Sequence, residues 1–155
     1  AHLGLAVVVL GITGVKSFEV ERDVRMGLGD VVEIGEFRFQ LKELREVTGP
    51  NYRAVRGVFD VSRDGRVIEQ LYPEKRRYFS SAMPMTEAAI DSGFWRDLYV
   101  SLGDMVQASP PEWSVRVYYK PFVPWLWTGA LLMTLGGLLA AIDRRYRKDA
   151  KGGRE

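Results

Sequence analysis

FVPWLWTGALLMTLGGLLAAI, residues 122–142, decides the fold of this 155-residue chain. The stretch holds 21 residues without a formal charge, and as a helix it covers roughly the 30 Å hydrocarbon core of a bilayer. Tyrosines, tryptophans and a lysine stand at its start, between residues 118 and 127, and the basic sequence DRRYRK follows its end. This pattern predicts a transmembrane helix over residues 121–143 that runs from the outer to the cytoplasmic side, followed by a basic cytoplasmic tail over residues 144–155.

A second uncharged run opens the chain, from Ala1 to Val15. As a helix it reaches only about 22 Å. We therefore interpret residues 1–18 as an N-terminally truncated transmembrane helix whose first turns lie upstream, in a longer protein from which this chain is cut. Because the later helix runs inward, this one runs outward, and residues 19–120 lie on the outer face of the membrane.

The later helix also carries small residues spaced four apart. Such spacing lets a second helix approach closely, which predicts that this helix packs inside a larger bundle. The alternative is that glycine and alanine are simply common in membrane helices. The pairs are Ala130 and Thr134, Gly136 and Ala140, and Gly137 and Ala141.

The middle of the chain, residues 19–120, is typical of β structure. Residues 36–41 and 113–118 alternate apolar and polar side chains, and period two means that one face of each strand is buried. Asp64-Gly65 separates residues 52–61 from 66–72, and this dipeptide favours a tight hairpin turn. We expect further strands at residues 30–34 and near 99–102. We also expect a loop at Pro110-Pro111 and a short helical turn at residues 86–91.

These elements predict the fold class: an α+β membrane protein in which two transmembrane helices flank a small all-β domain of five or six strands, barrel-like or sandwich-like.

From Lys16 to Lys120 there are 16 basic and 17 acidic residues, so nothing argues for a nucleic-acid partner. The chain has no cysteine, which excludes disulfides, thiolate metal sites and cysteine nucleophiles. Its only histidine lies in a predicted membrane helix, which excludes a self-contained Ser-His-Asp hydrolase site.

That histidine, His2, is the main candidate for chemistry. An imidazole in hydrocarbon needs a partner. It could form a hydrogen bond to a neighbouring helix, ligate haem iron, or relay protons, and the residues themselves leave these roles open.

Three other groups are weaker candidates. Met83 and Met85 could suggest a copper site, but two thioethers make a poor cage and methionine commonly fills apolar gaps. Residues 74–77, Glu-Lys-Arg-Arg, could bind an anion, although a solvated loop is the simpler interpretation. Glu87 and Asp91 could share a helical face as paired carboxylates, but with no other acid, base or nucleophile beside them they are better interpreted as solvated surface.

Several segments together resemble one family. They are LAVVVLGITGV, LYPEKRRY, MPMTEAAID, FWRDLYVSLGD, WSVRVYYKPFVPWLW and GGLLAAIDRRYR, and they resemble, in order and spacing from residue 1 to Arg147, the C-terminal region of the CcmF family of cytochrome c-type biogenesis proteins. The resemblance implies a multi-pass haem lyase component of the bacterial inner membrane, with residues 19–120 in the periplasm. Such a component takes haem from a periplasmic haem chaperone and directs its attachment to the Cys-x-x-Cys-His motif of an apocytochrome.

The resemblance also implies a cofactor and partners. The family carries a b-type haem held by two membrane histidines, one of which corresponds to His2, so His2 is the expected axial ligand of the haem iron and the second ligand lies upstream. The expected partners are the haem chaperone, the apocytochrome-presenting subunits and membrane lipid. The family's tryptophan-rich haem-handling segment also lies upstream, and Trp125 and Trp127 are not part of it, so this chain alone is expected to be catalytically inert.

A different class of function remains open. The chain could be a membrane-tethered periplasmic docking or assembly module without a cofactor of its own. In that case His2 would be replaceable.

Overall fold

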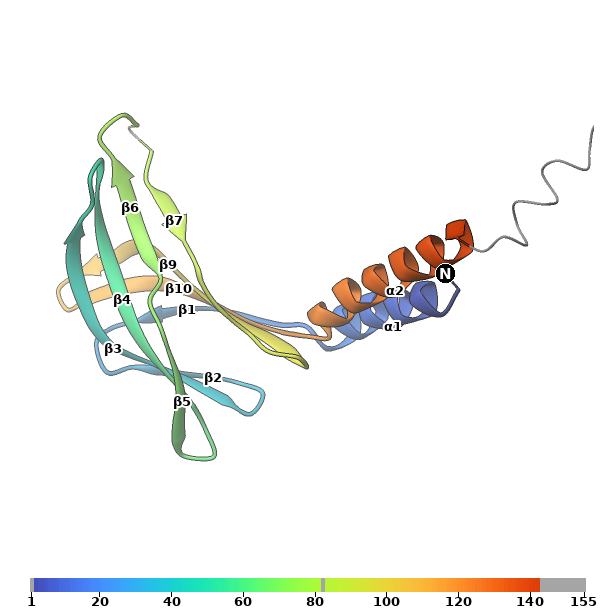
Figure 1. The fold of residues 1–155 in the computed structure, drawn as a ribbon. Helices are drawn as coiled ribbons and strands as arrows, with labels where there is room; N and C mark the ends of the chain where they lie inside the picture. The colour runs from blue at the N-terminus through green and yellow to red at the C-terminus, as the bar shows by residue number, and fades with distance from the viewer. Residues whose placement is uncertain (1, 82, 143–155) are drawn as a thin grey trace, which may run out of the picture. The chain divides into compact units, whose positions relative to one another are not determined.

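The computed structural model describes residues 2–81 and 83–142 in two compact units (Figure 1). The helical unit contains α1 (His2–Phe18), α2 (Val123–Ile142) and the short segment Phe94–Arg96. The β unit contains Glu19–Gly93 and Asp97–Lys120. The predicted basic tail, residues 144–155, lies outside the described residues.

The β unit is built from two antiparallel sheets. The first has the strand order β1-β10-β9-β8, and the second has the order β2-β3-β4-β6-β7, with β5 paired to β4. The strands of the first sheet are β1 (Val20–Met26), β8 (Ala89–Ser92), β9 (Arg96–Ala108) and β10 (Pro111–Pro121). Those of the second are β2 (Val31–Ile34), β3 (Phe37–Thr48), β4 (Tyr52–Arg63), β5 (Arg66–Leu71), β6 (Glu74–Tyr78) and β7 (Met85–Glu87).

The core lies between the two sheets, as in a β-sandwich. Each sheet contributes every second side chain of its central strands, because successive side chains of a strand point to opposite faces. Phe39 and Leu41 of β3 and Phe59 of β4 are fully buried, and they belong to one cluster with Val100 of β9 and Val115 of β10. The predicted α+β architecture with a small β domain is confirmed.

The predicted hairpin at Asp64-Gly65 is also confirmed. It joins β4 to β5, and both turn residues have positive φ, 51° for Asp64 and 75° for Gly65. A tight hairpin turn needs this backbone conformation, which Asp-Gly supplies at little steric cost. The alternating segments 36–41 and 113–118 fall almost wholly in β3 and β10.

Three local predictions are wrong. Residues 86–91 form no helical turn: they lie in β7, which pairs with β6, and in β8, which pairs with β9. Residues 74–77 are not a loop but most of β6. The residues that the structure describes form ten strands rather than five or six, because short strands such as β7 and β8 are set by pairing with distant residues rather than by their own pattern. The break expected at Pro110-Pro111 before the last strand is present as a turn at Ser109 and Pro110, although Pro111 already belongs to β10.

In the helical unit, α1 and α2 pack against each other through glycines. A Cβ added to Gly4 would lie 2.6 Å from the backbone nitrogen of Met133, and one added to Gly11 would lie 3.3 Å from that of Leu126. The small-residue pairs that we predicted for helix packing do not make this contact, since Thr134, Gly137, Ala140 and Ala141 are exposed. Packing of that face against a further helix stays a prediction.

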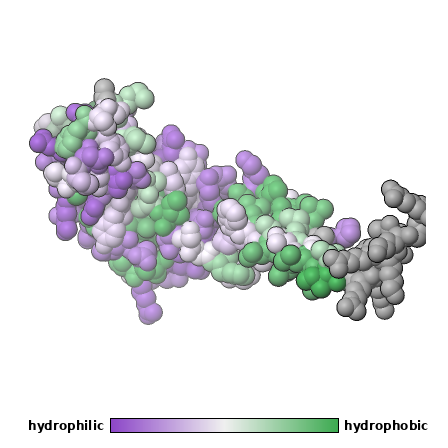
Figure 2. Space-filling view, turned by 45° about the horizontal axis from the view of Figure 1, so that its top comes forward, coloured by the Kyte–Doolittle hydropathy of each residue, from purple (hydrophilic) through white to green (hydrophobic). Residues whose placement is uncertain are grey.

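The rest of the helix-pair surface is apolar. Figure 2 shows it mostly green, whereas the β unit mixes hydrophilic and hydrophobic patches. The helix α2 is long enough and apolar enough to cross a membrane, and α1 is a shorter apolar helix of 17 residues. Leu131, Leu135 and Leu139 of α2 and Leu3, Leu5 and Leu10 of α1 are exposed.

Candidate functional site

His2 stands in the first turn of α1, on the face turned away from α2. The buried glycines Gly4 and Gly11 mark the face that contacts α2. Residues three, four and seven positions after His2 share its face; they are Leu5, Ala6 and Val9, and all of them are exposed. His2 is exposed as well. The helix pair thus presents an imidazole within an apolar strip on its outside.

Among the described residues, the surroundings of His2 do not complete a metal site. The sequence has no second histidine and no cysteine, and the described residues contain no group of three or more His, Cys, Asp or Glu side chains that could hold a metal ion.

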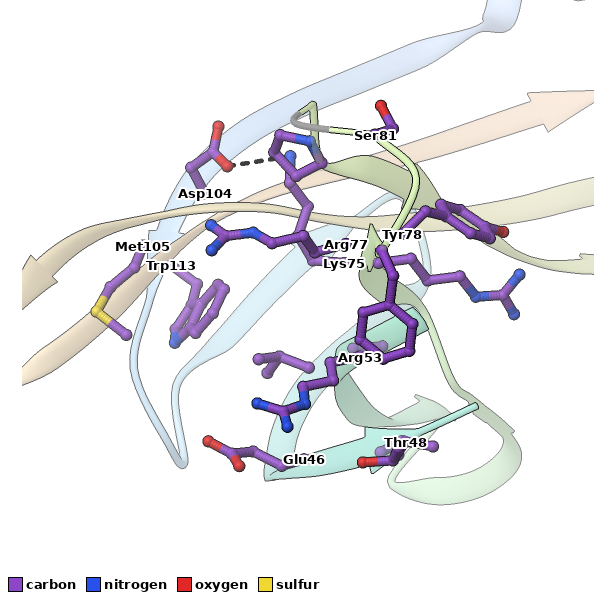
Figure 3. A pocket seen from close by; sticks show the side chains of 16 residues that line it. Glu46, Thr48, Arg53, Lys75, Arg77, Tyr78, Ser81, Asp104, Met105 and Trp113 are labelled. Carbon is purple, nitrogen blue, oxygen red and sulfur yellow. Dashed lines mark ion pairs between the residues drawn. The ribbon is translucent and has the colours of Figure 1, made fainter. Parts of the chain in front are cut away.

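The β unit has a second candidate site, a hollow of about 840 Å³ at one end of the sandwich (Figure 3). Its lining comes from β3, β4 and β6 of one sheet and β9 and β10 of the other. A cavity of this size is in the range that holds a small ligand or a short stretch of peptide. Trp113 and Met105 contribute apolar surface, and the charged lining residues are Glu46, Arg53, Lys75, Arg76, Arg77 and Asp104.

Strand register places two arginines of this lining directly opposite each other. Arg53 of β4 pairs with Arg77 of β6, and on the other side of β4 it pairs with Thr48 of β3. Both arginines are exposed, and the hydrogen bonds and ion pairs of the described residues give neither of them an acidic partner. Like charges at directly opposed positions of a sheet are destabilising. The hollow therefore presents two guanidinium groups and a hydroxyl in one row, an arrangement suited to an anion.

The next row of the hollow is charge-balanced. Lys75, two residues before Arg77 and on the same face, forms an ion pair with Asp104 of β9, with Nζ 3.1 Å from Oδ1. Lys75 also donates a hydrogen bond to the Thr86 hydroxyl at 3.2 Å. Figure 3 shows the Lys75–Asp104 pair beside Trp113 and Met105. This pair links the two sheets and leaves Arg53 and Arg77 as the hollow's unmatched cations.

The charged run at residues 74–77 is divided between the two faces of β6. Glu74 and Arg76 join a different network, although Arg76 also lines the hollow. Glu74 is 4% exposed, and its carboxylate accepts hydrogen bonds from Arg56 Nε at 2.6 Å and Arg76 Nε at 2.7 Å. Arg76 also pairs with Glu87 at 3.2 Å. The anion-binding alternative for this run therefore concerns Arg77 rather than Arg76, whose acidic partners are Glu74 and Glu87.

The Glu74 network shifts the ionisation of its members. Burial alone would raise the pKa of the Glu74 carboxyl, but the hydrogen bonds from Arg76 and Arg56 outweigh it, and the net effect is a lowered pKa. The same bond raises the pKa of Arg76 further above its ordinary value. Glu74 is therefore a structural anion held ionised between two arginines.

The remaining predicted residues do not come together. Met83 and Met85 are 75% and 54% exposed, so they do not fill apolar gaps as we expected. Glu87 and Asp91 lie on strands of different sheets and share no helical face. Sequence reasoning missed Arg53, Asp104 and Trp113, although the inward position of Arg53 could have been found by extending the alternation of the predicted strand toward its start.

Comparison with known proteins identifies the family. Residues 17–121 match the family described as the CcmF C-terminal beta-sandwich. The chain is 53% identical over 148 residues to the cytochrome c-type biogenesis protein CcmF of Escherichia coli K12, covering 96% of this chain and 23% of that protein. It is 50% identical over 151 residues to CcmF of Pseudomonas aeruginosa, covering 97% of this chain and 23% of that protein.

A solved structure supports the fold. The protein titled "Cytochrome c Heme Lyase CcmF" matches with a TM-score of 0.69 at 22% identity, over 88% of this chain and 23% of that one. The chain thus spans about a quarter of the length of the relatives it matches. These matches confirm the family predicted from the sequence: the chain belongs to the CcmF family of cytochrome c-type biogenesis proteins, and residues 17–121 match its C-terminal β-sandwich.

Proposed function

We propose that this chain is the C-terminal part of a cytochrome c haem lyase component of the bacterial inner membrane. In this proposal α1 and α2 span the membrane within residues 1–18 and 121–143, residues 19–120 are periplasmic, and residues 144–155 are cytoplasmic. Family membership supports it, as do the length and apolar surface of α2. The charge pattern around residues 121–155 supports the orientation.

The role that we assign to His2 is axial ligation of a b-type haem. The observation that carries it is the position of His2 on the apolar face of α1 that is turned away from α2. An imidazole surrounded by apolar side chains suits a haem buried in a membrane protein, and Leu5 and Val9 would exclude water beside it. The second axial ligand would come from upstream of Ala1. When bound, such a haem supplies one electron at a time, which would keep the iron of the substrate haem ferrous during attachment.

The experiment is a reduced-minus-oxidised visible spectrum of the full-length parent protein in the wild type and in His2→Ala. We expect His2→Ala to lose the b-type haem signal at equal protein yield, and Leu10→Ala, at another exposed apolar position of α1, to keep it. An unchanged spectrum in His2→Ala would remove the ligand role. It would favour the alternative function, a membrane-tethered docking module without its own cofactor.

We further propose that the β unit is the docking unit, and that the hollow receives an acidic segment of a partner. The candidates by class are the haem chaperone and the apocytochrome-presenting subunits. The row Thr48, Arg53 and Arg77 supports this proposal, because guanidinium groups bind carboxylates and no acid of the described residues pairs with these two arginines. Trp113 and Met105 add the apolar contact that protein interfaces commonly combine with arginine.

Charge reversal tests the docking proposal. Arg53→Glu and Arg77→Glu in the full-length parent should each weaken co-purification with the maturation partners. Arg25→Glu, an exposed arginine on β1, should leave co-purification unchanged and serves as the control for net charge. Equal co-purification in all three variants would exclude the hollow as the docking site and would leave the role of His2 untouched.

A further inference from the structure

The tip of the β8–β9 hairpin belongs to the helical unit. The last register pair of the hairpin joins Ser92 and Asp97, and the tip residues Phe94–Arg96 cluster with α1 and α2 rather than with the β unit. A backbone hydrogen bond fixes this attachment, since Phe122 N–H donates to the carbonyl oxygen of Trp95 at 2.9 Å.

Aromatic rings surround this hydrogen bond. The Trp95 ring lies 5.5 Å from that of Trp125, centroid to centroid, and the Phe94 ring lies 6.5 Å from it. Phe122 contacts Trp125 at 5.6 Å, and Phe18 at the end of α1 lies 6.5 Å from Phe122. The hairpin tip and the neighbouring ends of both helices therefore form one aromatic cluster, which consists of Phe18, Phe94, Trp95, Phe122 and Trp125.

Much of this cluster faces outward. Phe94 is 62% exposed and Trp95 is 60% exposed. Small and polar residues are the usual choice for a hairpin tip, so two large aromatic side chains there require a partner surface. Trp127, one turn into α2, is exposed as well.

We propose that Phe94 and Trp95 anchor the hairpin tip in the headgroup region of the membrane. They would form a third membrane contact, which lies between the two spanning helices in the sequence. This inference rests on the proposed spanning of α1 and α2. Phe94 and Trp95 lie at the level where the uncharged run of α2 begins, directly after Lys120. Aromatic rings, and tryptophan above all, are enriched at this level of a bilayer because an amphipathic ring suits the boundary between hydrocarbon and headgroups.

Lipid is a better occupant for these rings than another helix of the protein. The charge pattern supports lipid: Lys16 in the last turn of α1 places a cation beside the aromatic cluster, where it suits anionic headgroups. Lys120, the other cation next to the helices, is already paired with Glu19, with Nζ 2.9 Å from Oε1. The hydrogen bond from Phe122 to Trp95 then ties the depth of the hairpin tip to the depth of α2.

Depth measurements in vesicles test this anchor. A nitroxide spin label would be attached through Phe94→Cys, and separately through Trp95→Cys, in the full-length parent with its other cysteines removed and reconstituted into vesicles of phosphatidylcholine and phosphatidylglycerol. The accessibility of the label to oxygen, which concentrates in lipid, is compared with its accessibility to a water-soluble nickel complex. Trp127→Cys is the reference within the helix, and Asp64→Cys, at the β4–β5 turn, is the aqueous reference.

We expect positions 94 and 95 to show an oxygen-to-nickel ratio severalfold above that of position 64 and below or equal to that of position 127. An aqueous ratio at both tip positions, with position 127 in lipid, would overturn the anchor and keep the spanning helices. Low access to both reagents at the tip would also overturn it, in favour of a covering protein element. An aqueous ratio at position 127 as well would refute the spanning proposal itself.

Discussion

Gly4 of α1 and Gly129 of α2 meet backbone to backbone. A Cβ added to Gly4 would lie 2.7 Å from the carbonyl oxygen of Gly129, and one added to Gly129 would lie 2.8 Å from that of Gly4. Close approach of this kind, with no side chains between the backbones, is how small residues pack helices in membranes. It also sets the rotation of α1, and that rotation turns His2 away from α2.

This contact leads to the first prediction. Gly129→Ala should destabilise the helix pair by about 1–3 kcal/mol, the usual cost of overpacking, because its Cβ would meet backbone atoms that cannot move aside. Gly137→Ala is the matched control on the same helix, where an added Cβ meets nothing within 4 Å. Thermal unfolding in detergent measures both variants, and equal midpoints would show that the Gly4–Gly129 contact does not form.

The second prediction concerns the buried carboxylate of β6. Glu74→Gln should lower the free energy of unfolding of the β unit by about 1–3 kcal/mol, because two charge-assisted hydrogen bonds weaken and two arginines lose their shared anion. Glu33→Gln removes an exposed pair with Arg38 and should cost less than about 1 kcal/mol. Denaturant unfolding distinguishes the two variants, and equal losses would contradict the structural role of Glu74.

The third prediction is a pH dependence. Arg76 and Arg56 lower the pKa of Glu74 in the folded state, and a hydrogen bond from Arg116 lowers that of Asp23. In an unfolded chain the carboxyls of Glu and Asp have pKa values of about 4.3 and 3.9. A lowered folded-state pKa contributes stability that is fully present above the unfolded value and is lost as the pH falls through the folded value.

Unfolding should therefore become easier below about pH 4. The decrease should be shallower in Glu74→Gln than in the wild type, because one of the two carboxyls no longer titrates. Denaturant midpoints between neutral and acidic pH measure this difference. Parallel curves for the two proteins would mean that the ionisation of Glu74 does not contribute.

The fourth prediction concerns the effect of Arg77, a proposed binding residue of the hollow, on the stability of the β unit. Arg77→Gln should slightly stabilise the β unit, by about 0.2–1 kcal/mol, because it relieves the repulsion from Arg53 across the β4–β6 ladder. The gain should shrink in high salt, which screens exposed charges. Arg66→Gln is the comparison variant for this change in stability. Arg66 lies opposite Arg63 at the end of the β4–β5 hairpin, but Arg63 already has acidic partners in Glu36 and Asp64. A salt-independent loss of stability in Arg77→Gln would show that Arg77 is a structural residue.

The residues themselves determined the features that depend on local chemistry. The uncharged runs predicted two apolar helices, since length and hydropathy are properties of the segment alone. Asp64-Gly65 predicted its turn because positive φ is a preference of those two residues. The family could be recognised for a related reason. The resemblance rests on short sequence segments in a given order along the chain, and these can be read without knowing the fold.

The tertiary structure decided everything that depends on which residues meet. Residues 86–91 became two strands in different sheets because distant strands offered them hydrogen-bonding partners. The run 74–77 reads as one charged cluster along the chain, but the alternation of a strand sends Glu74 to a buried network and Arg77 to the hollow opposite Arg53. The direction of His2 likewise followed from where the glycines of α1 meet α2. Pairing and packing join residues far apart in sequence, and no local pattern records which partner each residue will find.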